Sequence, residues 1–102
     1  MSRPKFRIHL LRVAEDDLTE IVTYIAADRP SAAEALATRI EKSLQRLAHN
    51  PRLGRIPNEE DLIGLGYRYL VVENYLIFCT IQGHTIFVHR ILHGARDYLS
   101  LF

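Results

Sequence analysis

The stretch "YRYLVVENYLIFCTIQGHTIFVHRIL", residues 67–92, consists of three apolar segments separated by two short polar spacers. The spacers are Glu73-Asn74 and Gln82-Gly83-His84. Spacers of two or three residues join antiparallel strands in hairpins, so this stretch predicts a three-stranded antiparallel meander. The middle segment, residues 75–81, is apolar at both odd and even positions. It therefore predicts a central strand that is covered on both faces.

Upstream of the meander, the pattern predicts one strand and two helices. Residues 5–10, "KFRIHL", alternate between polar and apolar side chains, which is the period of a half-buried strand. Apolar residues then recur at helical spacing in two runs. The residues expected to face inward in these runs are Ala14, Leu18, Ile21, Val22, Ile25, Ala33, Leu36, Ile40, Leu44 and Leu47.

Prolines mark the expected ends of the two helices. We expect Pro30 to end the first helix, and Ser31 with Glu34 to form a capping box for the second. Pro51 is expected to close the second helix, and residues 51–66 then read as a loop. Two amphipathic helices with so short a break between them form an antiparallel hairpin.

The order of elements predicts a single α+β domain over residues 1–102, with the helix hairpin packed on one face of the twisted sheet. The hydrophobic fraction of 48%, the charged fraction of 25% and the formal charge of +1 are ordinary for a globular protein and indicate no particular partner. The first residues include no apolar core of signal-peptide length, and no apolar run reaches membrane-spanning length, so we expect a cytoplasmic protein. Cys79 is expected to be a buried, unreactive thiol.

Several common site signatures are absent from the sequence. It has no glycine-rich phosphate loop, no paired-cysteine metal motif and no nucleophile elbow. His89 and His93 are four residues apart, which on a strand separates them by about 13 Å. We therefore predict no metal site and no cofactor.

Polar residues gather in and after the last predicted strand. Arg90 would be costly to bury without a partner, so it should pair with a carboxylate or line a concave polar surface. His93, Arg96 and Tyr98 follow closely, and Arg68 lies on a neighbouring strand. Such a set could cleave RNA, with His93 as the base and arginines stabilising phosphate charge. Ion pairs and hydrogen bonds that close the end of the sheet are the alternative interpretation.

An ordered series of motifs resembles a known family. The motifs are Ala14-x-x-Asp17-Leu18-x-x-Ile21-x-x-Tyr24-Ile25, Leu47-x-x-x-Pro51-x-x-Gly54-Arg55, Gly66-Tyr67-Arg68, Tyr75-Leu76-Ile77-Phe78 and Arg90-Ile91-Leu92-His93-Gly94-Ala95-Arg96-Asp97-Tyr98. With these motifs the chain resembles the RelE/ParE superfamily of toxins from bacterial type II toxin-antitoxin modules, and it is most similar to the ParE-like branch.

The resemblance implies a growth-inhibiting toxin that is neutralised by a cognate, adjacently encoded antitoxin in a hetero-oligomer. ParE-like members inhibit DNA gyrase, whereas RelE-like members cut messenger RNA on the ribosome. Leu70 and Leu76 stand where RelE-like nucleases carry basic residues. A gyrase inhibitor without catalysis of its own is therefore our first hypothesis. The alternatives are a ribosome-dependent endoribonuclease that uses Arg68, His93, Arg96 and Tyr98, and an inactive member that still binds antitoxin.

The second half of the chain has features that would suit an acidic antitoxin segment. After Lys42 the chain contains arginines but no further lysine, and arginine binds carboxylates well. An edge strand and exposed leucines near the helices would offer a surface for an extended or helical peptide. The residues expected to bind a partner are Arg68, Arg90, Arg96, Leu99, Leu101 and Phe102.

Overall fold

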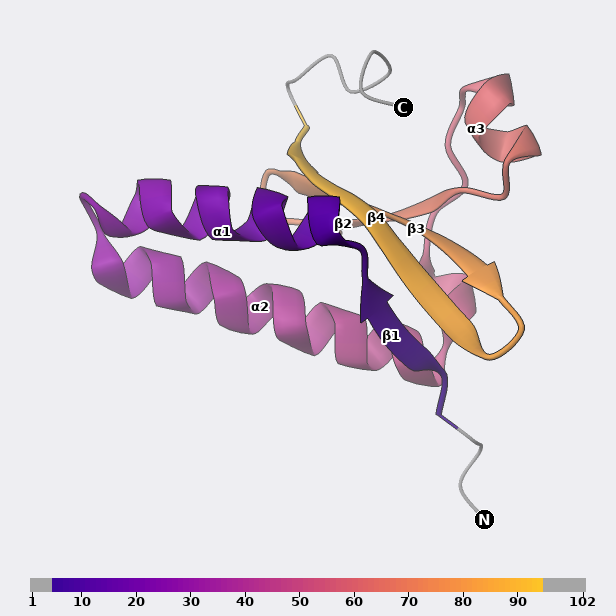
Figure 1. Cartoon of the computed structure of the whole chain (residues 1–102), viewed down its shortest axis with the longest axis horizontal. Helices are drawn as coiled ribbons and strands as arrows, with labels where there is room; N and C mark the ends of the chain where they lie inside the picture. The colour runs from indigo at the N-terminus through magenta and orange to yellow at the C-terminus, as the bar shows by residue number, and fades with distance from the viewer. Residues whose placement is uncertain (1–4, 95–102) are drawn as a thin grey trace.

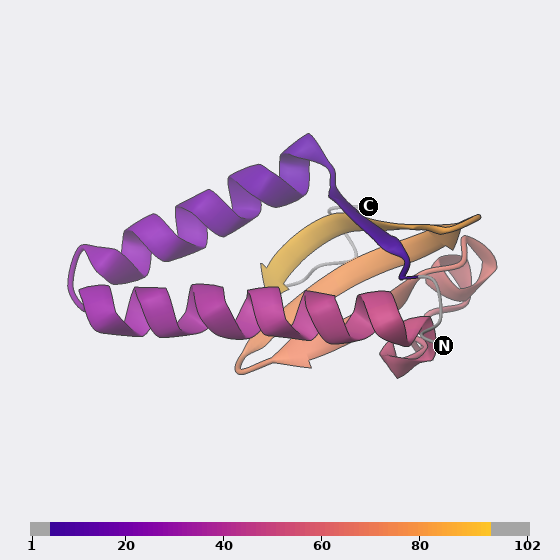
Figure 2. The same cartoon turned by 90° about the horizontal axis from the view of Figure 1, so that it is seen from below.

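A computed structural model describes residues 5–94, which form a helix hairpin against a four-stranded sheet (Figure 1). The elements are β1 (Arg7–Leu10), α1 (Arg12–Ala26), α2 (Pro30–His49), the 3-10 helix η1 (Pro51–Leu53), α3 (Glu60–Gly64), β2 (Arg68–Val72), β3 (Tyr75–Gln82) and β4 (Thr85–His93). The strand order is β1-β4-β3-β2, with β1 parallel to β4 and the other pairs antiparallel. Figure 2 shows the hairpin along one side of the sheet. The predicted α+β class, meander and hairpin are confirmed.

The main apolar core lies between the hairpin and the sheet. Alternate residues of β3 and β4 face it, and α2 supplies most of its helical side chains. The fully buried members include Leu36, Ile40, Leu44, Leu47, Ile77, Cys79, Ile86, Val88 and Ile91. Helix α1 contributes one fully buried residue, Ala14, while Leu18, Ile21 and Ile25 are partly buried against the core. The predicted inward positions are thus confirmed except for Val22, which is half-buried and belongs to neither apolar cluster, and α1 is the more exposed helix.

The predicted boundary between the two helices is wrong. Pro30 is the first residue of α2 and does not end α1, which stops at Ala26. Proline suits the first helical position because its missing N–H has no partner there anyway. The expected capping box at Ser31 does not form, because Arg29 is the N-cap and no side chain caps this end. The stretch 51–66, expected as a loop, contains η1 and α3.

A second, smaller apolar cluster covers the other face of the sheet. Leu62 of α3 packs there with Phe78 of β3 and Leu92 of β4, and all three are buried. Tyr67, Tyr69 and Leu76 pack around them. The short helix α3 therefore supplies part of the cover that the two-sided apolar pattern of β3 predicts.

A β-bulge in β4 changes which residues face the hairpin. Phe78 lies opposite Arg90 whereas Cys79 lies opposite Val88, so His89 is the extra residue. An extra residue breaks the two-residue alternation of a strand. Before the bulge, Ile86 and Val88 face the main core; after it, Ile91 does.

Asp17 of α1 holds the helix hairpin to β4 just after this bulge. Its two carboxylate oxygens accept hydrogen bonds from Arg90 Nε at 2.7 Å and Arg90 Nη2 at 2.9 Å. Asp17 Oδ2 also accepts the backbone N–H of Ile91 at 3.0 Å. Strand β1 pairs with β4 only from Thr85 to Val88, so Asp17 satisfies an N–H beyond the end of that pairing. Of the two roles expected for Arg90, pairing with a carboxylate is the one that the structure shows.

We predict that Asp17→Ala lowers the free energy of unfolding by about 3 kcal/mol, because it leaves a largely buried guanidinium without its counter-ion. The Asp17 and Arg90 side chains are only 12% and 18% exposed. Asp16→Ala, one residue away at an exposed position, is the matched control and should change stability by less than about 0.5 kcal/mol. Urea unfolding followed by circular dichroism measures both. Equal effects of the two variants would contradict the role given to Asp17.

Candidate functional site

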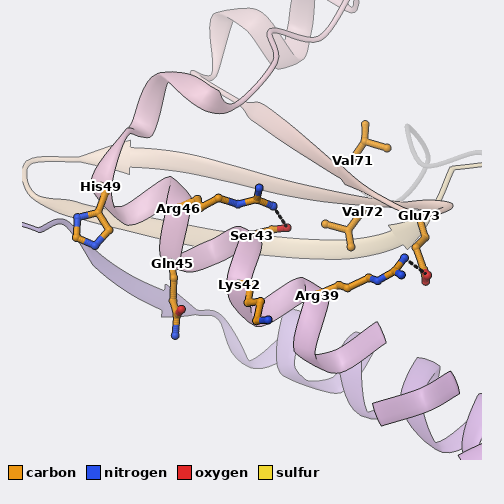
Figure 3. A pocket seen from close by; sticks show the side chains of 9 residues that line it. All are labelled: Arg39, Lys42, Ser43, Gln45, Arg46, His49, Val71, Val72 and Glu73. Atoms are coloured by element: carbon orange, nitrogen blue, oxygen red, sulfur yellow. Dashed lines mark hydrogen bonds and ion pairs between the residues drawn. The ribbon is translucent and has the colours of Figure 1, made fainter. Parts of the chain in front are cut away.

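A basic groove of about 760 Å³ lies between α2 and the end of β2 (Figure 3). Its lining residues are Arg39, Lys42, Ser43, Gln45, Arg46, His49, Val71, Val72 and Glu73. Four of them, Arg39, Lys42, Arg46 and His49, follow one another at spacings of three and four along α2. That spacing brings side chains to one face of a helix. Sequence reasoning missed this groove, although basic residues at helical spacing on the polar face of α2 are a signal that could have found it.

Positive charge dominates the lining of the groove. Glu73, in the turn after β2, is the one carboxylate among the lining residues, and it accepts a bond from Arg39 Nη1 at 2.8 Å. Arg46 Nη2 donates to Ser43 Oγ at 3.3 Å, as Figure 3 also shows. Arg39 and Glu73 are 63% and 40% exposed, so their ion pair is strongly screened by water. The groove therefore presents more cationic groups than it neutralises.

A second hollow of about 270 Å³ extends the groove along the same strand. It shares Ser43, Arg46 and Val71 with the first and adds Leu53, Arg55, Tyr69 and Leu70. Arg55 is held beside β2 by two backbone bonds with Tyr69, of 2.7 and 2.9 Å. Together the two hollows form what we call the basic groove.

Arg68, expected in both the nuclease and the partner-binding sets, is held by the segment before β2. Its Nη1 donates to the Gly54 carbonyl at 3.1 Å. A Cβ atom on Gly54 would lie 3.0 Å from the Cβ of Arg68. Glycine at this position therefore lets the chain approach β2 closely.

The structure does not bring the nuclease candidates Arg68 and His93 together. Arg68 lies opposite Cys79 on β3, whereas His93 lies opposite Tyr75, four residues further along the same strand. That offset alone is about 13 Å. His93 is exposed and its ring meets that of Tyr75 edge-on at 5.4 Å. Arg90 is engaged by Asp17. The remaining candidates, Arg96, Tyr98, Leu99, Leu101 and Phe102, lie outside the described residues.

His89, the bulge residue, forms a polar network that the sequence did not predict. Its Nδ1 is 3.2 Å from Tyr67 Oη and its Nε2 is 2.8 Å from Thr80 Oγ1. Burial lowers the pKa of His89 and raises that of Tyr67. Because both ring nitrogens have hydroxyl partners, the neutral imidazole fits this site well.

Leu70 and Leu76, which the resemblance places at basic positions of RelE-like nucleases, are packed side chains. Leu70 of β2 packs against the main core, and Leu76 of β3 packs against the smaller cluster around Phe78.

Cys79 is buried, and burial raises the pKa of its thiol to about 11, which keeps it protonated and unreactive at neutral pH. Within residues 5–94, no group of three or more His, Cys, Asp or Glu side chains is arranged to hold a metal ion. No helix in the same range is long and apolar enough to cross a membrane.

We predict that the protein loses stability as the pH falls through about 6.5, in part because of His89. The folded state lowers the pKa of this imidazole, so the unfolded chain binds the proton more tightly than the folded protein does. Once the pH falls below the ordinary pKa of histidine, proton binding therefore favours the unfolded chain. The loss of unfolding free energy from about pH 7.5 to about pH 5.5 should be smaller for His89→Gln than for the wild type. His49→Gln, at an exposed position of α2, is the control. Equal losses in His89→Gln and the wild type would show that protonation of His89 is not coupled to folding.

Comparison with solved structures shows the same fold in two toxin-antitoxin systems. The chromosomal ParDE system of P. aeruginosa contains a chain that superposes with a TM-score of 0.72 at 20% identity, over 87% of this chain and 96% of that one. A chain of the toxin-antitoxin complex RelBE2 of Mycobacterium tuberculosis matches with a TM-score of 0.60 at 20% identity, over 90% and 94% of the two chains. These matches establish the likeness of fold.

Sequence comparison gives the family. Toxin ParE1 of Mycobacterium tuberculosis, in two strains, is 36% identical over 66 residues. The alignment spans 64% of this chain and 64% of the curated relatives. The family model described as the ParE toxin of the type II toxin-antitoxin system, parDE, matches residues 8–98. The chain therefore belongs to the ParE family of toxins from type II toxin-antitoxin systems.

Proposed function

We propose that this protein inhibits bacterial growth by binding DNA gyrase, without catalysis of its own, and that a cognate antitoxin neutralises it. The observation that carries the choice of target is the packing of Leu70 and Leu76 into the two apolar clusters. A nuclease of the related RelE type would need charged groups there to stabilise the phosphate in its transition state. Each missing charge-stabilising donor is worth about 3 kcal/mol of the barrier.

The placement of the remaining polar residues supports the same choice. Arg68 donates to a backbone carbonyl and is separated along the sheet from His93. The imidazole of His89 is committed to Tyr67 and Thr80. A general base must come within hydrogen-bonding reach of the hydroxyl that it deprotonates, with charge-stabilising groups close to the same phosphate. Arg68 and His93 do not meet in such a constellation.

An antitoxin partner is proposed from the family and from the surface of the molecule. The two structurally similar proteins come from toxin-antitoxin systems, and the basic groove offers positive charge beside a sheet edge. Gyrase and antitoxin would both be met in the cytoplasm, which we propose as the compartment.

We predict that the purified chain inhibits supercoiling of relaxed plasmid by gyrase in a dose-dependent way, with inhibition complete at saturation. Gel electrophoresis of the plasmid measures this activity. The same preparation, added to a translating extract, should leave messenger RNA intact on a primer-extension gel. Transcripts cut in the presence of wild type and intact with Arg96→Ala, together with normal supercoiling, would replace the proposal with the endoribonuclease alternative.

We also predict that the chain co-purifies with the product of the neighbouring reading frame when both are expressed together. Growth should stop on expression of the chain alone and recover with both genes, because a bound antitoxin covers the surface that contacts the target. Plating and size-exclusion chromatography measure the two effects. A chain that leaves growth unchanged when expressed alone, and that elutes without its neighbour, would contradict the assignment as an active toxin.

A further inference from the structure

Strand β1 forms one edge of the sheet, and part of its backbone is open there (Figure 1). In a strand, the N–H and C=O groups of alternate residues point to the same side. Arg7 and Leu11 donate their N–H groups inward, to carbonyls on the β4 side. Ile8 and Leu10 therefore direct their backbone groups outward. Within residues 5–94, no backbone partner is present for these outward groups.

The open groups of β1 match a second copy of the same strand placed antiparallel to it. With Ile8 of one copy opposite Leu10 of the other, all four outward groups bond, and the two-fold axis passes between the two His9 residues. With Ile8 opposite Ile8, Leu10 would meet Phe6. The N–H of Phe6 already donates to the Ala48 carbonyl at 3.0 Å, so that register loses bonds. With Leu10 opposite Leu10, Ile8 would meet the start of α1.

The register about His9 also suits the side chains on both faces of the strand. Toward the helix hairpin, Ile8 would lie beside Leu10 of the second copy, and both side chains already pack at the border of the main core. On the opposite face, His9 would meet His9, and Arg7 would meet Leu11 of the second copy. Like charges directly opposite each other destabilise paired strands. This register places no lysine or arginine opposite another one.

An apolar groove beside β1 would receive the start of α1 from the second copy. The groove has a volume of about 590 Å³ and lies between β1 and α2, with Phe6 and Leu44 in its lining. The register about His9 brings the first residues of α1 of the second copy next to Phe6. Val13, in this first turn, is 49% exposed. Covering it in the groove would remove apolar surface of both copies from water, which favours association.

The charges of these two surfaces are opposite in balance. The groove is lined by two cations and one carboxylate, Lys5, Arg7 and Glu41. The exposed charged residues at the start of α1 are one cation and two carboxylates, Arg12, Glu15 and Asp16. Contact between them therefore brings a net negative surface to a net positive one, which favours this pairing over contacts between like surfaces.

We propose that two copies of this chain associate through antiparallel β1 strands about His9, so that their four-stranded sheets form one continuous sheet. The inference is independent of the proposed function, since it needs neither gyrase nor antitoxin. Strand β2 forms the opposite edge of each sheet. The basic groove beside β2 would therefore stay exposed in both copies.

A strand from an unrelated protein would also find open backbone groups at Ile8 and Leu10, but it fits the site less well. Exposed strand edges pair with many sequences, so backbone bonds alone do not select a partner. The second copy supplies three further features in one register. These are an apolar neighbour for Ile8, an exposed valine for the groove and a charge balance opposite to that of the lining.

Sedimentation velocity of the full-length chain tests the inference. The mean mass should rise toward twice that of the chain between about 1 and about 200 μM, because an interface of this kind is small. Hydrogen exchange of the Ile8 and Leu10 amides should slow at least about tenfold between the low and the high end of this range, as it does for amides in paired strands.

Charges placed at His9 test the two-fold contact directly. His9→Lys alone and His9→Glu alone should each dimerise at least about tenfold more weakly than the wild type, because like charges meet at the axis. An equimolar mixture of the two variants should dimerise within about threefold of the wild type, since lysine then faces glutamate. Gln82→Lys and Gln82→Glu make the same changes at an exposed position of β3, away from β1. Alone or mixed, they should stay within about twofold of the wild type.

Three results would overturn the inference. They are a chain that stays monomeric up to about 1 mM, a dimer that forms without protection of the Ile8 and Leu10 amides, and a dimer that both His9 variants leave intact. Failure of the mixed variants to associate would also contradict a contact between the two His9 residues. Circular dichroism confirms that every variant is folded. Because no target or antitoxin enters the experiment, its failure leaves the toxin assignment standing.

Discussion

The contact between Asp17 and β4 determines how the helix hairpin sits on the sheet. Strand β1 pairs with only the first part of β4, so the rest of that strand has an open edge. Asp17 binds the guanidinium of Arg90 and the N–H of Ile91 at this edge. A carboxylate with three donors is well compensated for its loss of water. The pair joins two of the motifs on which the family resemblance rests, although Asp17 and Arg90 are far apart in the chain.

The bulge at His89 is what makes this contact compatible with a continuous core. Val88 and Ile91 both face the hairpin, which a regular strand could not achieve because they are three residues apart. The extra residue also makes hydrogen bonds of its own. His89 bonds Tyr67 and Thr80 and thereby ties β4 to β3 and to the segment before β2. Polar residues that could belong to an active site are thus committed to holding the sheet.

The basic groove is the surface on which helix α2 and strand β2 present their charged side chains. Helix α2 buries one face in the core and presents cations on another, next to the edge of β2. That arrangement concentrates positive charge at a place where the chain also exposes backbone groups. Recognition of a partner by charge and by strand pairing needs only these two features, and neither requires reactive groups to converge.

The sequence by itself determined the four strands, the two long helices and the main core, but not the short helices η1 and α3. Periodicity and short spacers predicted the meander and the helix hairpin, because a side chain's distance from its neighbours along a helix or strand is set by local geometry. The sequence also predicted that Arg90 would either pair with a carboxylate or line a concave polar surface, because burying an unpaired charge is costly. It failed at Pro30, since proline both ends helices and begins them, and only packing selects between the two.

Tertiary structure alone decided which carboxylate Arg90 binds, where β1 pairs, and which side chains line the basic groove. These depend on contacts between residues distant in the chain: Asp17 reaches Arg90 across the molecule, and α2 meets β2 only after the chain has folded back. The bulge at His89 cannot be predicted from neighbouring residues in the sequence, because the register of β4 is set by its contacts with β3, with the hairpin core and with Asp17. Local patterns specify which faces are apolar. The arrangement of those faces in space specifies which polar residues meet, and so which surface is left for a partner.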